Sequence, residues 1–310
     1  MLKNYLHLLE ENIKLIGTKK ILLRLHAKQK KSYKEIAIQL GIGESSYRQY
    51  IQELAHPPIW FITKLKILDS NIFSKLENTN LKFTARKQIT TLPKNLSNDL
   101  AYFIGYLHGD GFLGSDKKTV GFSDEYKNQL IKINAICFKI FNKKGKIRKV
   151  KSPIGKKGSY HLEIRQNVIN SFLHRVFKIP RGFKDHLEIS SEIFKDKNFL
   201  KFYLMGIYDA DGTLPKNPEK VKQNFIDVGV KSKKLMCQIK LALKKFEIST
   251  LKLYARKTKS IAGKKFKKPS TIWELRIRRK SEIIRFLKEI GFNHPIKKKR
   301  MKKLQKKLGL

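Results

Sequence analysis

The sequence is poor in acidic residues. Its 310 residues include 25 Asp and Glu against 69 Lys and Arg, so the formal net charge at neutral pH is +44. A charge of this size favours a polyanionic partner such as DNA, RNA or an anionic membrane surface. Hydrophobic residues still make up 41% of the chain and aromatic residues 10%. This content supports a folded core and excludes a purely disordered basic tail.

Cysteine and long hydrophobic runs are also scarce. Only Cys137 and Cys237 are present, too few for a zinc cluster or a disulfide framework, and we expect both to be buried and reduced. The longest apolar run, residues 199–208, is too short and too interrupted to cross a bilayer, and no signal peptide follows Met1. We therefore expect an intracellular protein, in the cytoplasm, the nucleoid or an organelle, without a membrane partner.

A pattern of nine residues occurs twice in the chain. The segment from Phe103 to Gly111 (FIGYLHGDG) has the same order of residue types as the segment from Leu204 to Gly212 (LMGIYDADG), 101 residues later. Each segment is apolar nearly throughout, which predicts the C-terminal half of a buried helix. The spacing indicates a domain-scale duplication rather than a short tandem repeat.

Small residues stand four apart in both copies, at Gly105 and Gly109 and at Gly206 and Ala210. Residues four apart share one face of a helix, and small side chains there allow two backbones to approach closely. We therefore expect the two helices to pack on each other.

Both copies end in Asp-Gly. Gly111 and Gly212 suit the left-handed conformation that ends many helices. Asp110 and Asp211 then lie at helix C-termini, where the helix dipole disfavours an anion. Two carboxylates and two sets of free carbonyl groups at one place are suited to hard divalent cations such as Mg²⁺. Two ordinary Asp-Gly turns are the alternative, and the recurrence of the whole pattern favours the cation site.

These segments, within about residues 97–310, resemble the LAGLIDADG homing endonuclease family in its single-chain form with two motifs. The first copy departs from the family pattern at His108, where an acidic residue is usual. The resemblance implies an α+β fold of two αββαββα halves related by a pseudo-twofold axis, which form a saddle over double-stranded DNA. It also implies a monomer that cuts both strands at a long asymmetric target site.

The resemblance further implies the ligands of the metal ions. Asp110 and Asp211 would bind Mg²⁺ or Mn²⁺, and the backbone carbonyl groups of Gly109 and Ala210 would lie near the ions. One aspartate from each half would place the ions between two scissile phosphates, where they activate water and stabilise the leaving oxygen.

Basic residues near this centre are candidates for stabilising the charge of the transition state. Lys231 follows a predicted strand, although the equivalent position in the first repeat, Ser123 or Asp124, is not basic. Lys184 and Lys297 each follow the last helix of a repeat and a proline. For all three lysines, a structural or phosphate-binding role is the alternative.

The two repeats predict the same order of elements, over residues 97–196 and 197–310, and the second ends in a basic tail. Their strands alternate between apolar and charged residues, which predicts one core face and one open face. In the strand of the second repeat that is expected to begin at Leu251, the apolar residues are Leu251, Leu253 and Ala255. We expect the open faces to be strongly cationic and to contact DNA through His161, Arg165, Lys252, Arg256, Arg276 and Arg278.

Residues 1–80 precede the duplication and look helical. Within them, Gly41-Ile-Gly43 separates two helical segments in a manner that resembles a helix-turn-helix, so Arg48 and Gln49 on the second helix are candidate DNA contacts. A plain helical hairpin is the alternative. Residues 81–96 are expected to be a linker.

Three functions fit the sequence. The first is a site-specific, metal-dependent DNA endonuclease, and the presence of both Asp110 and Asp211 favours it. The second is a DNA-binding regulator that does not cut DNA, and the helix-turn-helix-like region favours it, because a LAGLIDADG-like module joined to a helix-turn-helix is known for such regulators. The third is an RNA maturase that assists intron splicing.

Overall fold

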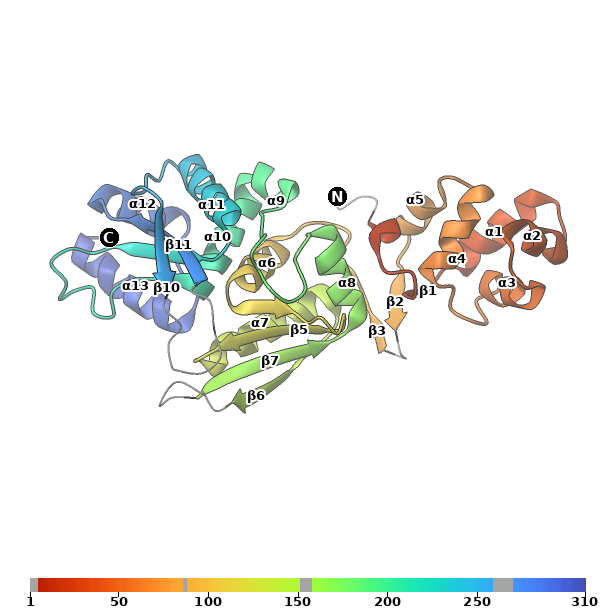
Figure 1. Ribbon diagram of the computed structural model, residues 1–310, viewed down its shortest axis with the longest axis horizontal. Coiled ribbons are helices and arrows are strands. Elements are labelled where there is room, and N and C mark those ends of the chain that lie inside the picture. Colours follow the sequence, from red (N-terminus) through yellow and green to blue (C-terminus); the bar gives the residue numbers. More distant parts are fainter. Residues whose placement is uncertain (1–4, 86–87, 151–157, 259–269) are drawn as a thin grey trace.

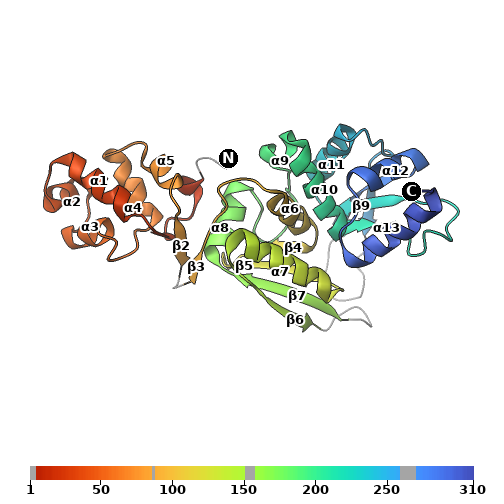
Figure 2. The same ribbon diagram turned by 180° about the vertical axis from the view of Figure 1, so that it is seen from behind.

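A computed structural model describes residues 5–85, 88–150, 158–258 and 270–310. Three regions follow one another along the long axis of the molecule (Figures 1 and 2), with the N-terminal helices at one end, the first repeat in the middle and the second repeat at the other end. The chain is therefore elongated, and the two repeats are direct neighbours.

The N-terminal region consists of short helices and a small sheet. Its helical elements are η1 (Leu6–Leu8), α1 (Lys19–Gln29), α2 (Tyr33–Leu40), α3 (Glu44–Ile51), α4 (Ile59–Lys64), η2 (Leu65–Ile67) and α5 (Ile72–Glu77). Ser32 caps α2 in a capping box with Glu35, and Gly41 ends this helix in the left-handed conformation. The sharp break between α2 and α3 therefore follows from local sequence.

Three short antiparallel strands join this region to the first repeat, in the order β1-β2-β3. They are β1 (Lys14–Ile16), β2 (Lys82–Ala85) and β3 (Gln88–Thr90). Residues 81–96, expected to be a linker, thus contain two strands. Each strand is too short to produce a recognisable alternation, but β2 pairs with β1 and buries Phe83. The pairing therefore depends on a partner that is distant in the sequence.

Both repeats have the element order αββαββα. The first contains α6 (Asn98–Asp110), β4 (Gly111–Leu113), β5 (Thr119–Asp124), α7 (Lys127–Phe141), β6 (Lys146–Val150), β7 (Ser159–Arg165) and α8 (Asn167–Val176). The second contains α10 (Lys197–Asp211), β8 (Gly212–Thr213), β9 (Ile226–Val230), α11 (Lys233–Lys245), β10 (Tyr254–Thr258), β11 (Ser270–Ile277) and α12 (Lys280–Glu289), with α9 (Ser191–Lys195) between the repeats. Both sheets are antiparallel, in the orders β4-β5-β7-β6 and β8-β9-β11-β10. The predicted α+β class is confirmed.

The helices α6 and α10 form the centre of the molecule. A Cβ atom added to Gly105 would lie 3.1 Å from the backbone nitrogen of Ile207, and one added to Gly206 would lie 2.9 Å from that of Tyr106. Only glycine allows backbones to come this close. The expected packing of the two helices is confirmed, and it explains the two glycines.

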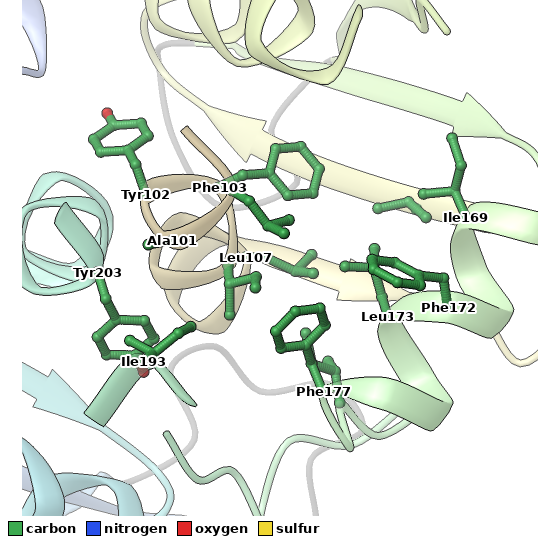
Figure 3. Close-up of a cluster of buried hydrophobic side chains, with 14 of the residues drawn as sticks. Ala101, Tyr102, Phe103, Leu107, Ile169, Phe172, Leu173, Phe177, Ile193 and Tyr203 are labelled. Atoms are coloured by element: carbon green, nitrogen blue, oxygen red, sulfur yellow. The ribbon is translucent and has the colours of Figure 1, made fainter. Parts of the chain in front are cut away.

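The core of the first repeat lies on the other side of α6. Phe103 and Leu107 of α6 point toward Phe172 and Leu173 of α8, whereas Tyr203 of α10 lies across the helix pair (Figure 3). All five side chains are almost completely buried. Each motif helix therefore has one face in its own repeat and one against the other motif helix, which explains its nearly continuous apolar sequence.

The expected left-handed conformation of the two motif glycines is wrong. Gly111 has φ −101° and Gly212 has φ −72°, both in the extended region. Each helix passes directly into a short strand, β4 or β8, that pairs with the next strand. A Cβ atom added to Gly111 would lie 2.7 Å from Cα of Leu107, and one added to Gly212 would lie 2.9 Å from Cα of Tyr208. Glycine is required there by lack of space.

The C-terminal segment is a helix rather than a basic tail. The helix α13 (Pro295–Leu308) begins at a proline and is capped by His294. Leu304 is buried and Met301 packs against the core. Because lysines dominate the composition of this segment, they conceal the few apolar residues that fix it to the second repeat.

Two smaller expectations also differ. The strand expected from Leu251 begins at Tyr254, and Leu251 is 42% exposed beside β10, the edge strand of its sheet. Cys137 is buried as expected, but Cys237 is exposed on α11. In the part of the chain that the structure describes, no helix is long and apolar enough to cross a membrane.

Candidate metal and nucleic-acid site

The two motif helices bring Asp110 and Asp211 together at their C-terminal ends. A Cβ atom added to Gly109 of α6 would lie 3.0 Å from Oδ2 of Asp211 on α10. The close approach of the two helices thus places each aspartate beside the last turn of the opposite helix.

Both carboxyl groups are in an environment that disfavours their charge. Burial raises the pKa of Asp110 to about 7, and the nearby charge of Asp211 adds to this shift. Burial also raises the pKa of Asp211 to about 6, while the ammonium groups of Lys184 and Lys297 oppose the shift. Among the described residues, no hydrogen bond or ion pair ends on either carboxylate. The pair is therefore poised to accept positive charge.

Two cavities, one on each side of the helix pair, contain these carboxylates. The Asp110 cavity, of about 420 Å³, is lined by Asp110, Ala210 and Lys297 together with Asp124 and His294. The Asp211 cavity, of about 320 Å³, is lined by the corresponding residues with the two repeats exchanged, namely Asp211, Gly109 and Lys184, together with Lys231. Each cavity therefore combines the aspartate of one motif with the residue that precedes the aspartate in the other.

A lysine ammonium group closes the C-terminus of each motif helix. Nζ of Lys184 donates to the carbonyl oxygens of His108, at 3.0 Å, and of Gly109. Nζ of Lys297 donates to those of Asp209 and Ala210, at 2.6 Å and 2.7 Å. The last carbonyl groups of a helix lack partners within the helix, and they carry the negative end of its dipole.

Burial lowers the pKa of both lysines, and the neighbouring aspartates oppose this shift. Lys184 and Lys297, which the sequence suggested as candidates, thus lie beside Asp110 and Asp211. Their positions also give them a structural role, which was the alternative.

The donor chemistry fits a divalent ion through the carboxylates. Carboxylate and carbonyl oxygens are the ligands that Mg²⁺ and Mn²⁺ prefer. The carbonyl oxygens of Gly109 and Ala210 accept from ammonium groups, but a carbonyl oxygen has a second lone pair and can accept again. Within the described ranges, no group of three or more His, Cys, Asp or Glu side chains could hold a metal ion. A bound ion would therefore rely on the two aspartates, on the carbonyl oxygens of Gly109 and Ala210, and on water.

Lys231, the third lysine candidate, lines the Asp211 cavity and is exposed. Its counterparts in the first repeat, Ser123 and Asp124, line the Asp110 cavity. The mismatch between the repeats is therefore located at the site itself, and the two cavities differ in charge.

Two tyrosines that the sequence analysis did not single out connect the motif helices. The hydroxyl of Tyr102 donates to Oδ2 of Asp209 at 2.6 Å, and that of Tyr203 lies 2.7 Å from Nδ1 of His108. Burial lowers the pKa of His108 to about 3, so its ring is neutral and belongs to the helix packing. The spacing of 101 residues between the tyrosines equals that between the motif aspartates, and this signal could have identified them.

The candidate DNA contacts of the sheets are less cationic than expected. Arg276 forms a two-pronged ion pair with Asp227 at 2.6–2.8 Å, and Arg256 pairs with Glu274 at 2.6 Å. Arg165 lies 3.5 Å from Glu163. The six candidates, exposed except for the half-buried His161, are His161, Arg165, Lys252, Arg256, Arg276 and Arg278. Of the acidic partners, Glu163 and Glu274 lie on the strands that carry Arg165 and Arg276, and Asp227 lies on the neighbouring strand β9.

Arg48 and Gln49 are exposed on α3, at the end of the molecule away from the motif helices (Figure 1). Arg48 pairs with Glu44 at 3.1 Å and lies over the ring of Tyr33. The structure thus places these two residues apart from the group formed by the aspartates and lysines.

Residues 198–291 match the family of LAGLIDADG-like domains. The chain contains a LAGLIDADG-like domain. The matched residues cover nearly all of α10 and extend to the end of α12, and the first motif lies outside them.

Three proteins are similar to parts of this chain. Over 159 residues, half of this chain is 31% identical to "Glutamine--fructose-6-phosphate aminotransferase [isomerizing]" of Methanocaldococcus jannaschii, and the match spans 13% of that protein. The structure of full-length DUF199/WhiA from Thermatoga maritima covers 70% of this chain and matches over 62% of its own, with 14% identity and a TM-score of 0.47. I-DmoI in complex with DNA and Mn covers 64% of this chain over 98% of its own, with 15% identity and a TM-score of 0.42. The chain thus spans only a small part of the curated relative.

Proposed function

We propose that this protein is a site-specific DNA endonuclease that uses divalent metal ions and cuts both strands of a duplex. The observation that carries the proposal is the pair of crossed cavities. Each is lined by one half-buried aspartate, the last-turn residue of the opposite motif helix and one half-buried lysine. Two equivalent sites beside one helix pair suit a reaction that has to occur twice, once on each strand.

The residues present have complementary tasks in such a reaction. Asp110 and Asp211 would hold the divalent ions, which supply activation of water and neutralise charge on the phosphate. Lys184 and Lys297 hold positive charge in the two cavities, where the phosphodiester would become more negative. The buried surroundings strengthen these interactions, because less water is present to screen them.

Duplex DNA is the proposed partner because of charge and position. The net charge of +44 provides strong nonspecific attraction to phosphate groups. The arginines on the sheets and on α3 are the candidate contacts that would add register and base specificity. A long asymmetric site and a monomeric protein follow from a pseudo-symmetric chain with two non-identical halves.

The test is cleavage of a randomised duplex library with Mg²⁺ or Mn²⁺, followed by sequencing of the cut ends. We expect wild-type protein to cut at a defined site and to stop when EDTA is added. Asp110→Asn and Asp211→Asn should each abolish double-strand cleavage but bind the duplex with nearly unchanged affinity. Asp99→Asn is the matched control, because it removes one charge from the exposed ion pair with Lys139 at the other end of α6.

A DNA-binding regulator that does not cut is the second candidate. Two observations favour it: the ammonium groups of Lys184 and Lys297 offset the charge of the two aspartates, and Gly41 separates α2 from α3 by a sharp break of the kind that a helix-turn-helix needs. Wild-type protein that binds a specific duplex but never cuts it with Mg²⁺ or Mn²⁺ would support this function. Preference for a structured intron RNA over every duplex would instead support the maturase function.

A further inference from the structure

Arg181 connects the N-terminal region with the segment that carries Lys184. Its Nη2 donates to Oε1 of Glu10 at 2.7 Å, and its Nε donates to Oδ1 of Asn170 at 2.7 Å. The side chains of Arg181 and Glu10 are only 12% and 14% exposed. An arginine that donates to two partners at once has little freedom to move, and a shielded charge pair costs much more to break than a surface pair.

The segment from Arg181 to Lys184 leads directly to the candidate site. The backbone nitrogen of Gly182 donates to the carbonyl oxygen of Leu113 at 2.9 Å. Phe183 is 84% exposed and contributes little to fixing the loop. Lys184 then inserts its ammonium group at the C-terminus of α6. Arg181 therefore fixes the beginning of this short segment, and Lys184 occupies its end.

Glu10 is itself held in place against α8. Its backbone nitrogen donates to Oγ of Ser171 at 3.1 Å. Nearby, the ring of Tyr5 packs edge-to-face on Phe172, with 5.6 Å between the ring centroids. The carboxylate of Glu10 is therefore presented by an ordered part of the N-terminal region that packs on the first repeat.

The second lysine is held by an analogous arrangement. His294 stands three residues before Lys297, as Arg181 stands three residues before Lys184. Nε2 of His294 lies 3.3 Å from Oδ2 of Asp124, while its Nδ1 accepts a hydrogen bond from the backbone N–H of Ile296 at the start of α13. In each case, a carboxylate from another part of the chain holds the residue that leads to the half-buried lysine.

We infer that Glu10 is a positioning residue for Lys184, and that the N-terminal region thereby controls cleavage of the DNA strand served by the Asp211 cavity. Asp124 performs the equivalent task for the Asp110 cavity from within the first repeat. The effect on cleavage rests on the proposed endonuclease function, whereas the positioning of Lys184 by Glu10 does not depend on it.

The experiment measures the cutting of each strand separately, on a duplex with a different label on each strand. Lys184→Met identifies the strand that depends on the Asp211 cavity. Glu10→Gln should slow the cutting of that strand about 10- to 100-fold, the range expected for a catalytic group displaced by about 1 Å. The other strand should be cut at the wild-type rate, so that nicked duplex accumulates. Glu11→Gln, which changes an exposed carboxylate one residue away, is the matched control and should cut like wild type.

A double variant separates positioning from a general loss of stability. If Glu10 acts through Lys184, Glu10→Gln together with Lys184→Met should cut no more slowly than Lys184→Met alone. Equal slowing of both strands by Glu10→Gln, or a further loss in the double variant, would overturn the inference.

A second readout does not need cleavage. Acetylation of amino groups, mapped by mass spectrometry, should label Lys184 several-fold faster in Glu10→Gln than in wild type, with Lys297 unchanged as the internal reference. Unchanged labelling of Lys184 would refute the positioning role. If wild-type protein never cuts, the proposed function fails, and this labelling still decides the position of Lys184.

Discussion

Asp211→Asn should stabilise the metal-free protein at alkaline pH. Burial raises the pKa of Asp211 from an ordinary 3.8 to about 6. A carboxyl group whose pKa is raised by folding contributes stability below about pH 4, and this contribution is lost as the pH rises through about 6. The shift of about 2 pKa units corresponds to roughly 3 kcal/mol of free energy of unfolding, because one unit equals about 1.4 kcal/mol.

Asn keeps the shape of the side chain but has no charge to bury. In EDTA, the variant should exceed wild type by roughly 3 kcal/mol in free energy of unfolding at pH 8, and by much less at pH 4.5. Removing this charge also relieves Asp110, whose pKa is raised in part by Asp211, so the effects of Asp110→Asn and Asp211→Asn should not add.

Urea unfolding at both pH values, followed by circular dichroism, measures these differences. Asp99→Asn serves as the control, and its difference from wild type should be small and independent of pH, because its ion pair with Lys139 is exposed. A free energy of unfolding for Asp211→Asn that is not above the wild-type value at pH 8, or a difference that is equal at both pH values, would refute the electrostatic argument. Adding Mg²⁺ at pH 8 should stabilise wild type more than the variant.

Two further predictions concern the helix pair and the N-terminal region. Gly206→Ala should lower the free energy of unfolding by about 1–3 kcal/mol, because its Cβ would lie 2.9 Å from the backbone nitrogen of Tyr106. Thermal denaturation measures this loss. Gly182→Ala is the comparison for backbone strain alone, because the space around Gly182 is open. The double variant Arg48→Ala, Gln49→Ala should bind duplex DNA more weakly than wild type. The slope of log affinity against log salt concentration should fall in magnitude by about one unit. Unchanged binding in a salt titration would exclude α3 as a DNA contact.

The duplicated motif predicted much of the fold. Apolar continuity around Gly105 and Gly206 required a buried helix, and small residues four apart required a close partner. The repeated order of elements followed because the strands of both repeats alternate over several residues. Short strands such as β4 and β8 lacked this signal, since two or three residues show no period.

The candidate site was predictable in its residues but not in its arrangement. Spacing identified Asp110 and Asp211, and the positions after proline suggested Lys184 and Lys297. The contacts of these lysines with the ends of α6 and α10 depend on chain folding over more than 70 residues, which no local pattern encodes. The acidic partners of the sheet arginines were visible in the sequence, but their pairing depends on strand register.

The supports of the two lysines suggest why a single chain with two different halves would be advantageous. A symmetric dimer has to hold both of its sites in the same way. In this chain, a carboxylate of the N-terminal region holds the segment that leads to Lys184, and a carboxylate of the first repeat holds the segment that leads to Lys297. A substitution at Glu10 therefore reaches one cavity, and a substitution at Asp124 reaches the other. Because the supports are separate, the proposed cutting of one strand would change with Glu10 without loss of the other, and among the described residues the N-terminal region holds the segment that leads to Lys184.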